Sequence, residues 1–168
     1  MNLQSHWNKA YATTETEKLG WYEESCTPSL DLIKACNLQQ SAAILNVGAG
    51  ASLLIDELIE LEYSNLIASD ISANALQNLK NRIGLNADKV NFIIDDLTNA
   101  TTLNKLQPVD LWHDRAVLHF FNTTEEQNTY FNLLHKLVKP NGYAIIATFN
   151  LDGALKCSGL CFSCFRSH

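Results

Sequence analysis

The feature that most constrains this chain is a short apolar segment at residues 44–47 that runs directly into a turn bracketed by Gly48 and Gly50. A helical pattern follows at residues 51–62, and a second apolar segment ends in Ser69-Asp70. Glycines let the backbone bend tightly and approach a ligand, and the start of the next helix offers unpaired N–H groups. A carboxylate at the end of the next parallel strand can accept hydrogen bonds from two adjacent ribose hydroxyls. This order favours a nucleotide site over an ordinary strand-to-helix turn.

The rest of the chain alternates between helical and strand patterns. Thr27 and Pro28 predict a helix start, with a capping hydroxyl before a proline at the first helical position. Ser72 and Gly84 bound another helix, and the sequence from Thr123 to Glu126 reads as a capping box. Further strands are expected at residues 90–94, 109–112 and 143–149, the last after a turn at residues 140–142. This alternation predicts an α/β fold with a parallel sheet covered on both faces.

Length, composition and charge limit the class of protein. A chain of 168 residues with 46% hydrophobic residues is most simply one globular domain. The net charge of −6 and the lack of a Lys/Arg-rich run argue against binding to nucleic acid. The first ten residues have no signal-peptide pattern, and no stretch approaches the roughly 20 apolar residues of a membrane span. We therefore expect a cytoplasmic protein without a membrane partner, with its five cysteines reduced.

The glycine turn departs from the dinucleotide fingerprint. The third glycine of that fingerprint would fall at Leu53, so the close packing that supports a pyrophosphate site is missing. A nicotinamide-dependent oxidoreductase is therefore disfavoured. A ligand with adenosine but no phosphates needs only the turn and the acid, and S-adenosylmethionine is such a ligand.

Several segments together resemble the class I S-adenosylmethionine-dependent methyltransferases over roughly residues 5–160. They are Ser-His-Trp-Asn-Lys-Ala-Tyr at 5–11, Asn-Val-Gly-Ala-Gly-Ala-Ser at 46–52, Ser-Asp-Ile-Ser at 69–72, Asp-Asp-Leu-Thr at 95–98, Asp-Leu-Trp-His-Asp-Arg-Ala at 110–116, Lys-Pro-Asn-Gly at 139–142 and Lys-Cys-Ser-Gly-Leu at 156–160. The resemblance implies a Rossmann-like three-layer sandwich with a mainly parallel sheet. It also implies S-adenosylmethionine as cofactor, with S-adenosylhomocysteine as product.

The first two strands end in the expected cofactor residues. Ligands of an open parallel sheet bind at the carboxyl ends of the strands. Gly48, Ala49 and Gly50 are expected at the methionine part of the cofactor, Asp70 at the ribose and Ile71 against the adenine. Asn46 is also placed in this site, although the family usually has Asp there, and the amide keeps the shape of the carboxylate but loses its charge.

The third predicted strand ends in Asp95, Asp96 and Leu97. A carboxylate here can accept a hydrogen bond from the adenine amino group, and a backbone N–H can donate to the ring. By resemblance we choose Asp96 over Asp95 as the acceptor, with Leu97 beside it. A solvated acidic loop is the alternative interpretation of both acids.

The fourth predicted strand ends in His113, Asp114 and Arg115. Methyl transfer is an in-line displacement, so a protein has to align the reactants and remove at most one proton. Asp114 or His113 can serve as that base, and His113 is also expected to contact the cofactor. In the alternative interpretation, Asp114 and Arg115 form a structural ion pair at the pocket floor.

Aromatic residues are concentrated near the N-terminus, within residues 1–28. Trp7 and Tyr11 share one helical face, and Trp21 and Tyr22 follow a loop. Such residues can attach a helix to the core, and in similar methyltransferases this segment forms a lid over the cofactor. Because aromatic faces attract a sulfonium ion, we place Trp7, Tyr11 and Tyr22 in the cofactor site.

The C-terminal residues 150–168 are expected to be an irregular tail of the single domain at 1–168. Cys157, Cys161 and Cys164 have the spacing of an iron–sulfur loop, but only four residues follow them, so no metal site is expected. Relatives continue for a helix and two strands, so the resemblance implies truncation and loss of the last two strands. The strand at 143–149 would then have an unpaired edge, which favours a homodimer or an aggregation-prone monomer.

The leading hypothesis is a methyltransferase that acts on a small molecule or on a protein side chain. The alternative is a degenerate protein or interaction subunit that binds S-adenosylmethionine without turnover. The sequence does not identify the methyl acceptor, because no residues outside the cofactor pocket are chemically distinctive.

Overall fold

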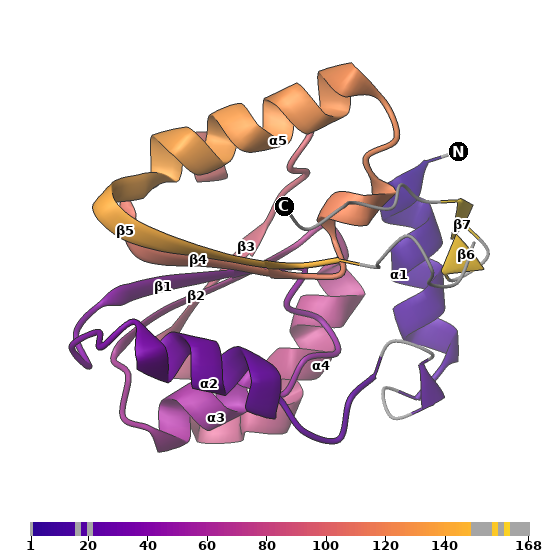
Figure 1. The fold of residues 1–168 in the computed structure, drawn as a ribbon. Coiled ribbons are helices and arrows are strands. Elements are labelled where there is room, and N and C mark those ends of the chain that lie inside the picture. Colours follow the sequence, from indigo (N-terminus) through magenta and orange to yellow (C-terminus); the bar gives the residue numbers. More distant parts are fainter. Residues whose placement is uncertain (1, 16–17, 20–21, 149–155, 158–159, 162–168) are drawn as a thin grey trace.

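The computed structural model describes residues 2–15, 18–19, 22–148, 156–157 and 160–161. Its central sheet has five parallel strands, in the order β3-β2-β1-β4-β5. They are β1 (Ala43–Val47), β2 (Asn65–Asp70), β3 (Val90–Ile94), β4 (Val109–Arg115) and β5 (Val138–Ala147) (Figure 1). The strand order reverses between β1 and β4, which is where an open α/β sheet opens a crevice for ligands. The predicted parallel Rossmann-like sheet is confirmed.

Helices cover both faces of the sheet. The helices α2 (Thr27–Ala35), α3 (Leu54–Glu60) and α4 (Ala73–Ile83) lie on one face, and α5 (Thr124–Leu137) lies on the other (Figure 1). Short 3-10 helices in the connections after α4 are η2 (Gly84–Lys89), η3 (Leu103–Lys105) and η4 (Leu118–Phe120).

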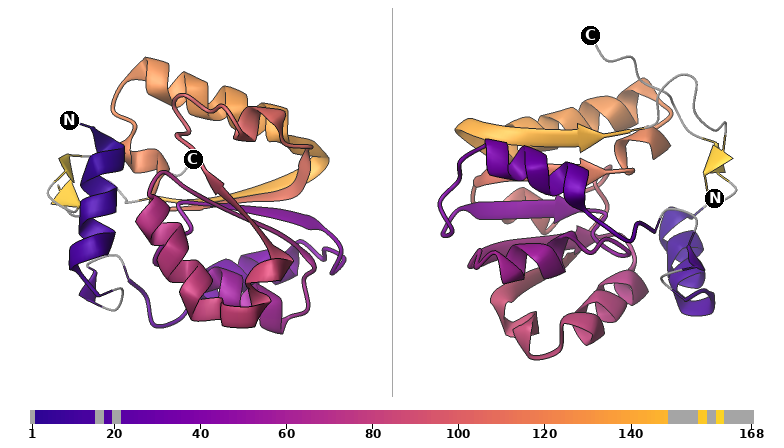
Figure 2. Two further views of the ribbon diagram at one scale, coloured as in Figure 1. Left: turned by 180° about the vertical axis from the view of Figure 1, so that it is seen from behind. Right: turned by 60° about the horizontal axis from the view of Figure 1, so that its bottom comes forward.

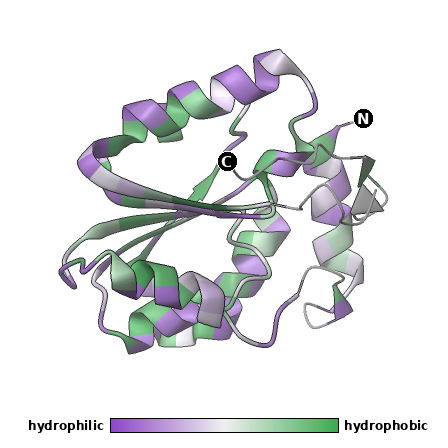
Figure 3. Ribbon diagram, in the orientation of Figure 1, coloured by the Kyte–Doolittle hydropathy of each residue, from purple (hydrophilic) through white to green (hydrophobic). Residues whose placement is uncertain are grey.

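Alternating side chains of the strands pack into two separate hydrophobic cores, one on each face of the sheet. Ile44 and Leu111 are fully buried on the side of α2, α3 and α4, whereas Leu45 and Trp112 are fully buried on the side of α5. Because neighbouring residues of a strand point to opposite faces, a strand buried on both faces is apolar along most of its length. In Figure 3 the strands and the sheet-facing sides of the helices are accordingly rich in hydrophobic residues.

The helix boundaries match the predicted caps at α4 and α5. The Ser72 hydroxyl accepts a hydrogen bond from the Ala75 N–H at 3.1 Å, and Gly84 ends α4 with a φ of 57°. Thr123 and Glu126 form the predicted capping box of α5. The prediction for α2 was wrong in one detail, because Thr27 is already inside the helix and Cys26 occupies the cap without a side-chain hydrogen bond.

The predicted turn at residues 140–142 lies inside a strand. Strand β5 begins at Val138 and continues through Pro140, and its register against β4 shifts between Val109 and Leu111. Asn141 has a φ of 63° at this irregularity. A proline is tolerated here because β5 is an edge strand of the sheet and has a bulge at this point.

Helix α1 (Leu3–Thr13) stands across the carboxyl ends of the strands (Figure 2). The Asn8 side chain accepts a hydrogen bond from the Ser72 hydroxyl at 2.9 Å, and the Asn78 amide donates to the Tyr11 carbonyl at 3.1 Å. These bonds fix α1 to α4, where it covers the edge of the sheet that a ligand would approach.

Two further short strands are described after β5. They are β6 (Lys156–Cys157) and β7 (Leu160–Cys161), which pair antiparallel. Within the described part of the chain, no helix has both the length and the apolar character needed to cross a lipid bilayer.

Candidate functional site

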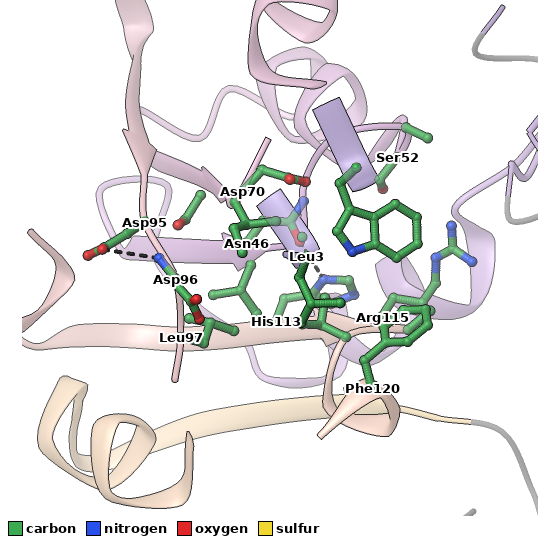
Figure 4. Close-up of a pocket in the computed structure, with 18 of the residues that line it drawn as sticks. Leu3, Asn46, Ser52, Asp70, Asp95, Asp96, Leu97, His113, Arg115 and Phe120 are labelled. Carbon is green, nitrogen blue, oxygen red and sulfur yellow. Dashed lines mark hydrogen bonds between the residues drawn. The ribbon is translucent and has the colours of Figure 1, made fainter. Parts of the chain in front are cut away.

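A pocket opens at the carboxyl ends of the strands, between the sheet and α1. It holds about 960 Å³ of space free of protein atoms, part of which is open to solvent. Figure 4 shows side chains from several elements converging on it. Most of the residues predicted from the sequence line this pocket, namely Trp7, Tyr11, Asn46, Gly48, Asp70, Ile71, Asp96, Leu97 and His113.

The four remaining predicted residues, Tyr22, Ala49, Gly50 and Asp114, do not line the pocket. Conversely, sequence reasoning missed Leu3, Ser52, Phe120 and Phe121, which do line it. The two phenylalanines follow the fourth strand, so the rule that placed His113 in the site could also have found them. Leu3 carries no sequence signal, because only the docking of α1 brings it to the pocket.

Gly48 and Gly50 have different structural roles. Gly48 lines the pocket with a φ of 63°, and a Cβ on it would collide with the Val117 side chain. A Cβ on Gly50 would lie 2.7 Å from the Ala75 Cβ and 2.8 Å from the Tyr11 ring. Gly50 therefore allows the close packing of α1 and α4 on the turn, and its place at the methionine part of the cofactor stays a prediction.

We expect Gly50→Ala to lower the free energy of unfolding by about 2–3 kcal/mol, because the added methyl group must displace α1 from the turn. Urea unfolding followed by tryptophan fluorescence would measure this loss. Asp88→Ala, at an exposed position, is the control and should change the free energy of unfolding by no more than about 0.5 kcal/mol. Equal losses in the two variants would contradict the packing role of Gly50.

The Asp70 carboxylate connects the glycine turn to the start of α4. It accepts hydrogen bonds from the Gly50 N–H at 3.1 Å and from the Ser72 N–H at 2.8 Å, one on each oxygen. Asp70 is 7% exposed, and burial raises its pKa to about 6. Each carboxylate oxygen can accept more than one hydrogen bond, so both can still accept from a ligand in the pocket.

The two acids that follow β3 differ in what their carboxylates bind. Asp95 accepts hydrogen bonds from the backbone N–H groups of Thr102 and Leu103, both at 2.8 Å, and so holds the loop before η3. Asp96 uses its Oδ1 atom for the Thr98 N–H and hydroxyl, and its Oδ2 atom has no hydrogen bond to a described residue. This difference favours Asp96 as the acid that can accept from a ligand.

Asp114 is fully buried below the pocket and supports the loop after β4. Its carboxylate accepts hydrogen bonds from the Tyr130 hydroxyl at 2.7 Å, from the Val117 N–H at 2.9 Å and from the Leu118 N–H at 3.1 Å. The prediction of Asp114 as a catalytic base is therefore corrected, because the carboxylate faces the protein interior.

Arg115 lines the pocket at the end of β4, and its guanidinium forms an ion pair with Glu23 at 3.0 Å. The alternative interpretation, an ion pair between Asp114 and Arg115, is not observed. Ala116 follows in a left-handed conformation, with a φ of 70°, and directs the chain across the pocket toward η4.

His113 lines the pocket but both of its ring nitrogens have protein partners. Nδ1 lies 2.9 Å from the Asn46 Oδ1 atom, and Nε2 lies 2.9 Å from the Ser29 hydroxyl. Burial, together with the charge of Arg115, lowers the pKa of His113 to about 4. The imidazole is therefore neutral at physiological pH, and both of its nitrogens are already engaged by protein groups.

The N-terminal aromatic residues pack against the core, and some of them also line the pocket. Trp7 contacts Phe120, with ring centroids 5.2 Å apart, and both line the pocket. Tyr11 is 8% exposed and Tyr22 packs against the same cluster, but only Tyr11 reaches the pocket. Trp21 lies outside the described residues. Helix α1 is thus attached to the core beside the pocket, and its role as a lid over a cofactor stays a prediction.

Among the residues that the structure describes, no group of three or more His, Cys, Asp or Glu side chains could hold a metal ion. Cys157 and Cys161 lie in β6 and β7, and Cys164 lies outside the described part.

Comparison with known proteins gives a family match and several related folds. A family model described as "Methyltransferase domain" matches residues 38–165. EEF1A lysine methyltransferase 2 from Danio rerio is 28% identical over 137 residues, which are 77% of this chain and 58% of that protein. The chain thus spans less than two thirds of this relative's length.

Solved structures of methyltransferases share the fold. A DhpI-SAM-HEP complex superposes with a TM-score of 0.68 at 15% identity, over 88% of this chain and 65% of the other. The Burkholderia thailandensis 1,6-didemethyltoxoflavin-N1-methyltransferase, with bound 1,6-didemethyltoxoflavin and S-adenosylhomocysteine, superposes with a TM-score of 0.66 at 22% identity, over 90% of this chain and 63% of the other.

Proposed function

The chain belongs to the methyltransferase domain family, and we propose on this premise that it binds S-adenosylmethionine in the pocket above β1, β2 and β4. The observation that carries the proposal is the Asp70 carboxylate, which lines the pocket while accepting the Gly50 N–H of the glycine turn. The family match identifies the ligand class, and this pairing of turn and acid gives the pocket its means of holding an adenosine.

The pocket residues fit the parts of this cofactor. Asp70 can accept from the ribose hydroxyls, and Asp96 can accept from the adenine amino group through its second oxygen. Ile71 and Leu97 offer apolar surface to the adenine ring. Trp7 and Tyr11 provide aromatic surface near the sulfonium, which attracts positive charge.

The bound cofactor would supply an electrophilic methyl group, and the protein has to align and shield it. Helix α1 and Phe120 cover part of the pocket, through the contact between Trp7 and Phe120, and so limit the access of solvent to it. Neither Asp114 nor His113 presents a basic atom to the pocket. We therefore propose that an acceptor nitrogen or oxygen gives its proton to solvent or to a partner, and that catalysis consists of alignment.

The acceptor is proposed to be a small molecule or a protein side chain. Both kinds occur among the relatives, since one is an EEF1A lysine methyltransferase and another methylates 1,6-didemethyltoxoflavin. The second candidate function is a cofactor-binding protein without turnover, which is favoured because neither Asp114 nor His113 offers a free basic atom to the described pocket. A radiolabelled methyl-transfer assay with candidate acceptors distinguishes the two.

Calorimetry on the 168-residue chain tests the proposed ligand. We expect S-adenosylhomocysteine to bind one site per chain and NAD to show no heat of binding. Methylthioadenosine, which lacks the amino-acid end, should bind more weakly at the same site. If S-adenosylhomocysteine does not bind while the chain is folded, the proposed function is wrong.

We also propose a homodimer through the free edge of β5, the strand at one end of the described sheet. Tyr143 and Ile146 are 43% and 36% exposed on this strand. An exposed strand edge with apolar side chains is suited to pairing with a second copy.

A cytoplasmic location stays a prediction from the sequence.

Replacement of Ile146 by lysine is expected to abolish this dimer, because a charge on the paired edge opposes association. Light scattering should give about twice the 18.8 kDa chain mass for the wild type and the single chain mass for Ile146→Lys. Leu85→Lys, at a 98% exposed leucine away from the sheet, is the control and should remain dimeric. A monomeric wild-type protein would contradict the proposal.

A further inference from the structure

The Asn46 side chain has a buried donor that no described residue satisfies. Asn46 is 1% exposed and lines the pocket, and its Nδ2 group has no hydrogen-bond partner. Leaving a buried donor unpaired costs about 1–3 kcal/mol. An amide held at the pocket wall at this cost indicates a ligand group that completes the hydrogen bond.

The orientation of this amide depends on two residues behind it. The His113 Nδ1 atom lies 2.9 Å from the Asn46 Oδ1 atom, and the His113 Nε2 atom lies 2.9 Å from the Ser29 hydroxyl of α2. A neutral imidazole carries one N–H, so donation from Nδ1 to Oδ1 requires Nε2 to accept the Ser29 proton. With the opposite tautomer the amide would turn its oxygen toward the pocket.

The charge around the site indicates which of the two orientations of the Asn46 amide suits a ligand. Arg115 lines the same pocket and lies close enough to His113 to influence its protonation. An outward N–H₂ group favours an acceptor such as a carboxylate and disfavours an ammonium, and the Arg115 guanidinium, which also pairs with Glu23 at 3.0 Å, adds a cation at the same wall. Figure 4 shows Asn46, His113 and Arg115 together at the pocket.

We propose that Ser29 and His113 are positioning residues that hold Asn46 with its N–H₂ group toward the pocket, where it donates to the carboxylate of the amino-acid end of the ligand. This inference rests on the proposed function, because S-adenosylmethionine and its product both carry that carboxylate. In this arrangement an Asn, rather than an acid, is required at the end of β1.

Asn46→Asp tests whether a hydrogen-bond donor or an acceptor faces the pocket at this position. We expect the affinity for S-adenosylhomocysteine to fall at least tenfold, because a carboxylate replaces the donor and repels the ligand carboxylate. The affinity for methylthioadenosine, which has no carboxylate, should change less than twofold. An unchanged or higher affinity for S-adenosylhomocysteine would overturn the inference, since it would mean that Asn46 presents an acceptor.

Ser29→Ala tests whether the hydrogen bonds from Ser29 to His113 and from His113 to Asn46 orient the amide, because Ser29 itself does not line the pocket. We expect about a threefold to tenfold loss of S-adenosylhomocysteine affinity, the range of one neutral hydrogen bond, with methylthioadenosine unaffected. Nitrogen-15 NMR of His113 should report an Nδ1–H tautomer in the wild type and a mixture in Ser29→Ala. Ser29→Thr, which keeps the hydroxyl, should restore both, and Ser64→Ala, at an exposed serine, is the control.

The outcomes separate this inference from the proposed function. If neither ligand binds the wild type, the proposed function fails. If both bind but His113 carries its proton on Nε2, or if Ser29→Ala changes neither the spectrum nor the affinity, only the positioning role is overturned.

Discussion

Replacement of Asp114 by alanine is expected to lower the free energy of unfolding by about 3–5 kcal/mol, the largest loss that we predict for one side chain of this protein. The carboxylate is fully buried and accepts hydrogen bonds from the Tyr130 hydroxyl and from the Val117 and Leu118 N–H groups. The truncation leaves all three donors without an acceptor in a site that water cannot reach. Urea unfolding of the 168-residue chain measures the loss.

Two comparisons make the Asp114 result specific. Asp88→Ala removes an exposed carboxylate and should change stability by no more than about 0.5 kcal/mol. Asp114→Asn keeps one acceptor oxygen and should lose less than Asp114→Ala. If a folded Asp114→Ala retained wild-type stability but lost methyl transfer, the residue would be catalytic after all, and its assignment as a support of the loop after β4 would be wrong.

Replacement of Asp70 by alanine is expected to weaken the binding of S-adenosylhomocysteine by about 1.5–3 kcal/mol, the usual effect of losing a charged hydrogen-bond partner. Because alanine also leaves the Gly50 and Ser72 N–H groups without an acceptor, Asp70→Asn is the second variant. Asparagine keeps an acceptor but lacks the charge, and it should weaken binding about tenfold. Calorimetry measures both, and Asp31→Ala on the exposed side of α2 is the control.

The same residue predicts how affinity depends on pH. Burial raises the pKa of Asp70 to about 6 in the free protein, so the carboxylate gains a proton as the pH falls through 6. A protonated acid accepts fewer hydrogen bonds from the ribose hydroxyls, and affinity should fall by up to tenfold per pH unit below 6. The pKa of His113 is lowered to about 4, so its charge does not change between pH 5 and 8. The Asp70→Asn variant should lack this pH dependence, and its persistence there would exclude Asp70 as the source.

Much of the fold was predictable because it depends on local patterns that the sequence carries explicitly. The apolar strands, the Ser72 cap, the Gly84 stop and the capping box at Thr123 each follow from the conformational preferences of neighbouring residues. The prediction missed the start of α2 and the bulge at residues 140–142. There the backbone conformation is chosen by pairing with β4 and by packing, which a local pattern does not contain.

The sequence predicted which residues lie near the site better than it predicted their roles there. The rule that ligands meet the carboxyl ends of parallel strands found Asn46, Asp70, Asp96 and His113 at the pocket. The rule could not separate residues that face the pocket from those that support it. Asp114 and His113 are neighbours in β4, yet one points to the core under α5 and the other points between Asn46 and Ser29.

The sequence by itself determined the order in which strands and helices follow one another along the chain. It also determined the glycine turn and the acids that end the strands, because these depend on residue type and spacing. Only the tertiary structure decided the role of each polar group. Whether a carboxylate, an imidazole or an amide is available to a ligand depends on which donors and acceptors other elements bring to it. Those partners come from residues as distant in the chain as Ser29 is from His113.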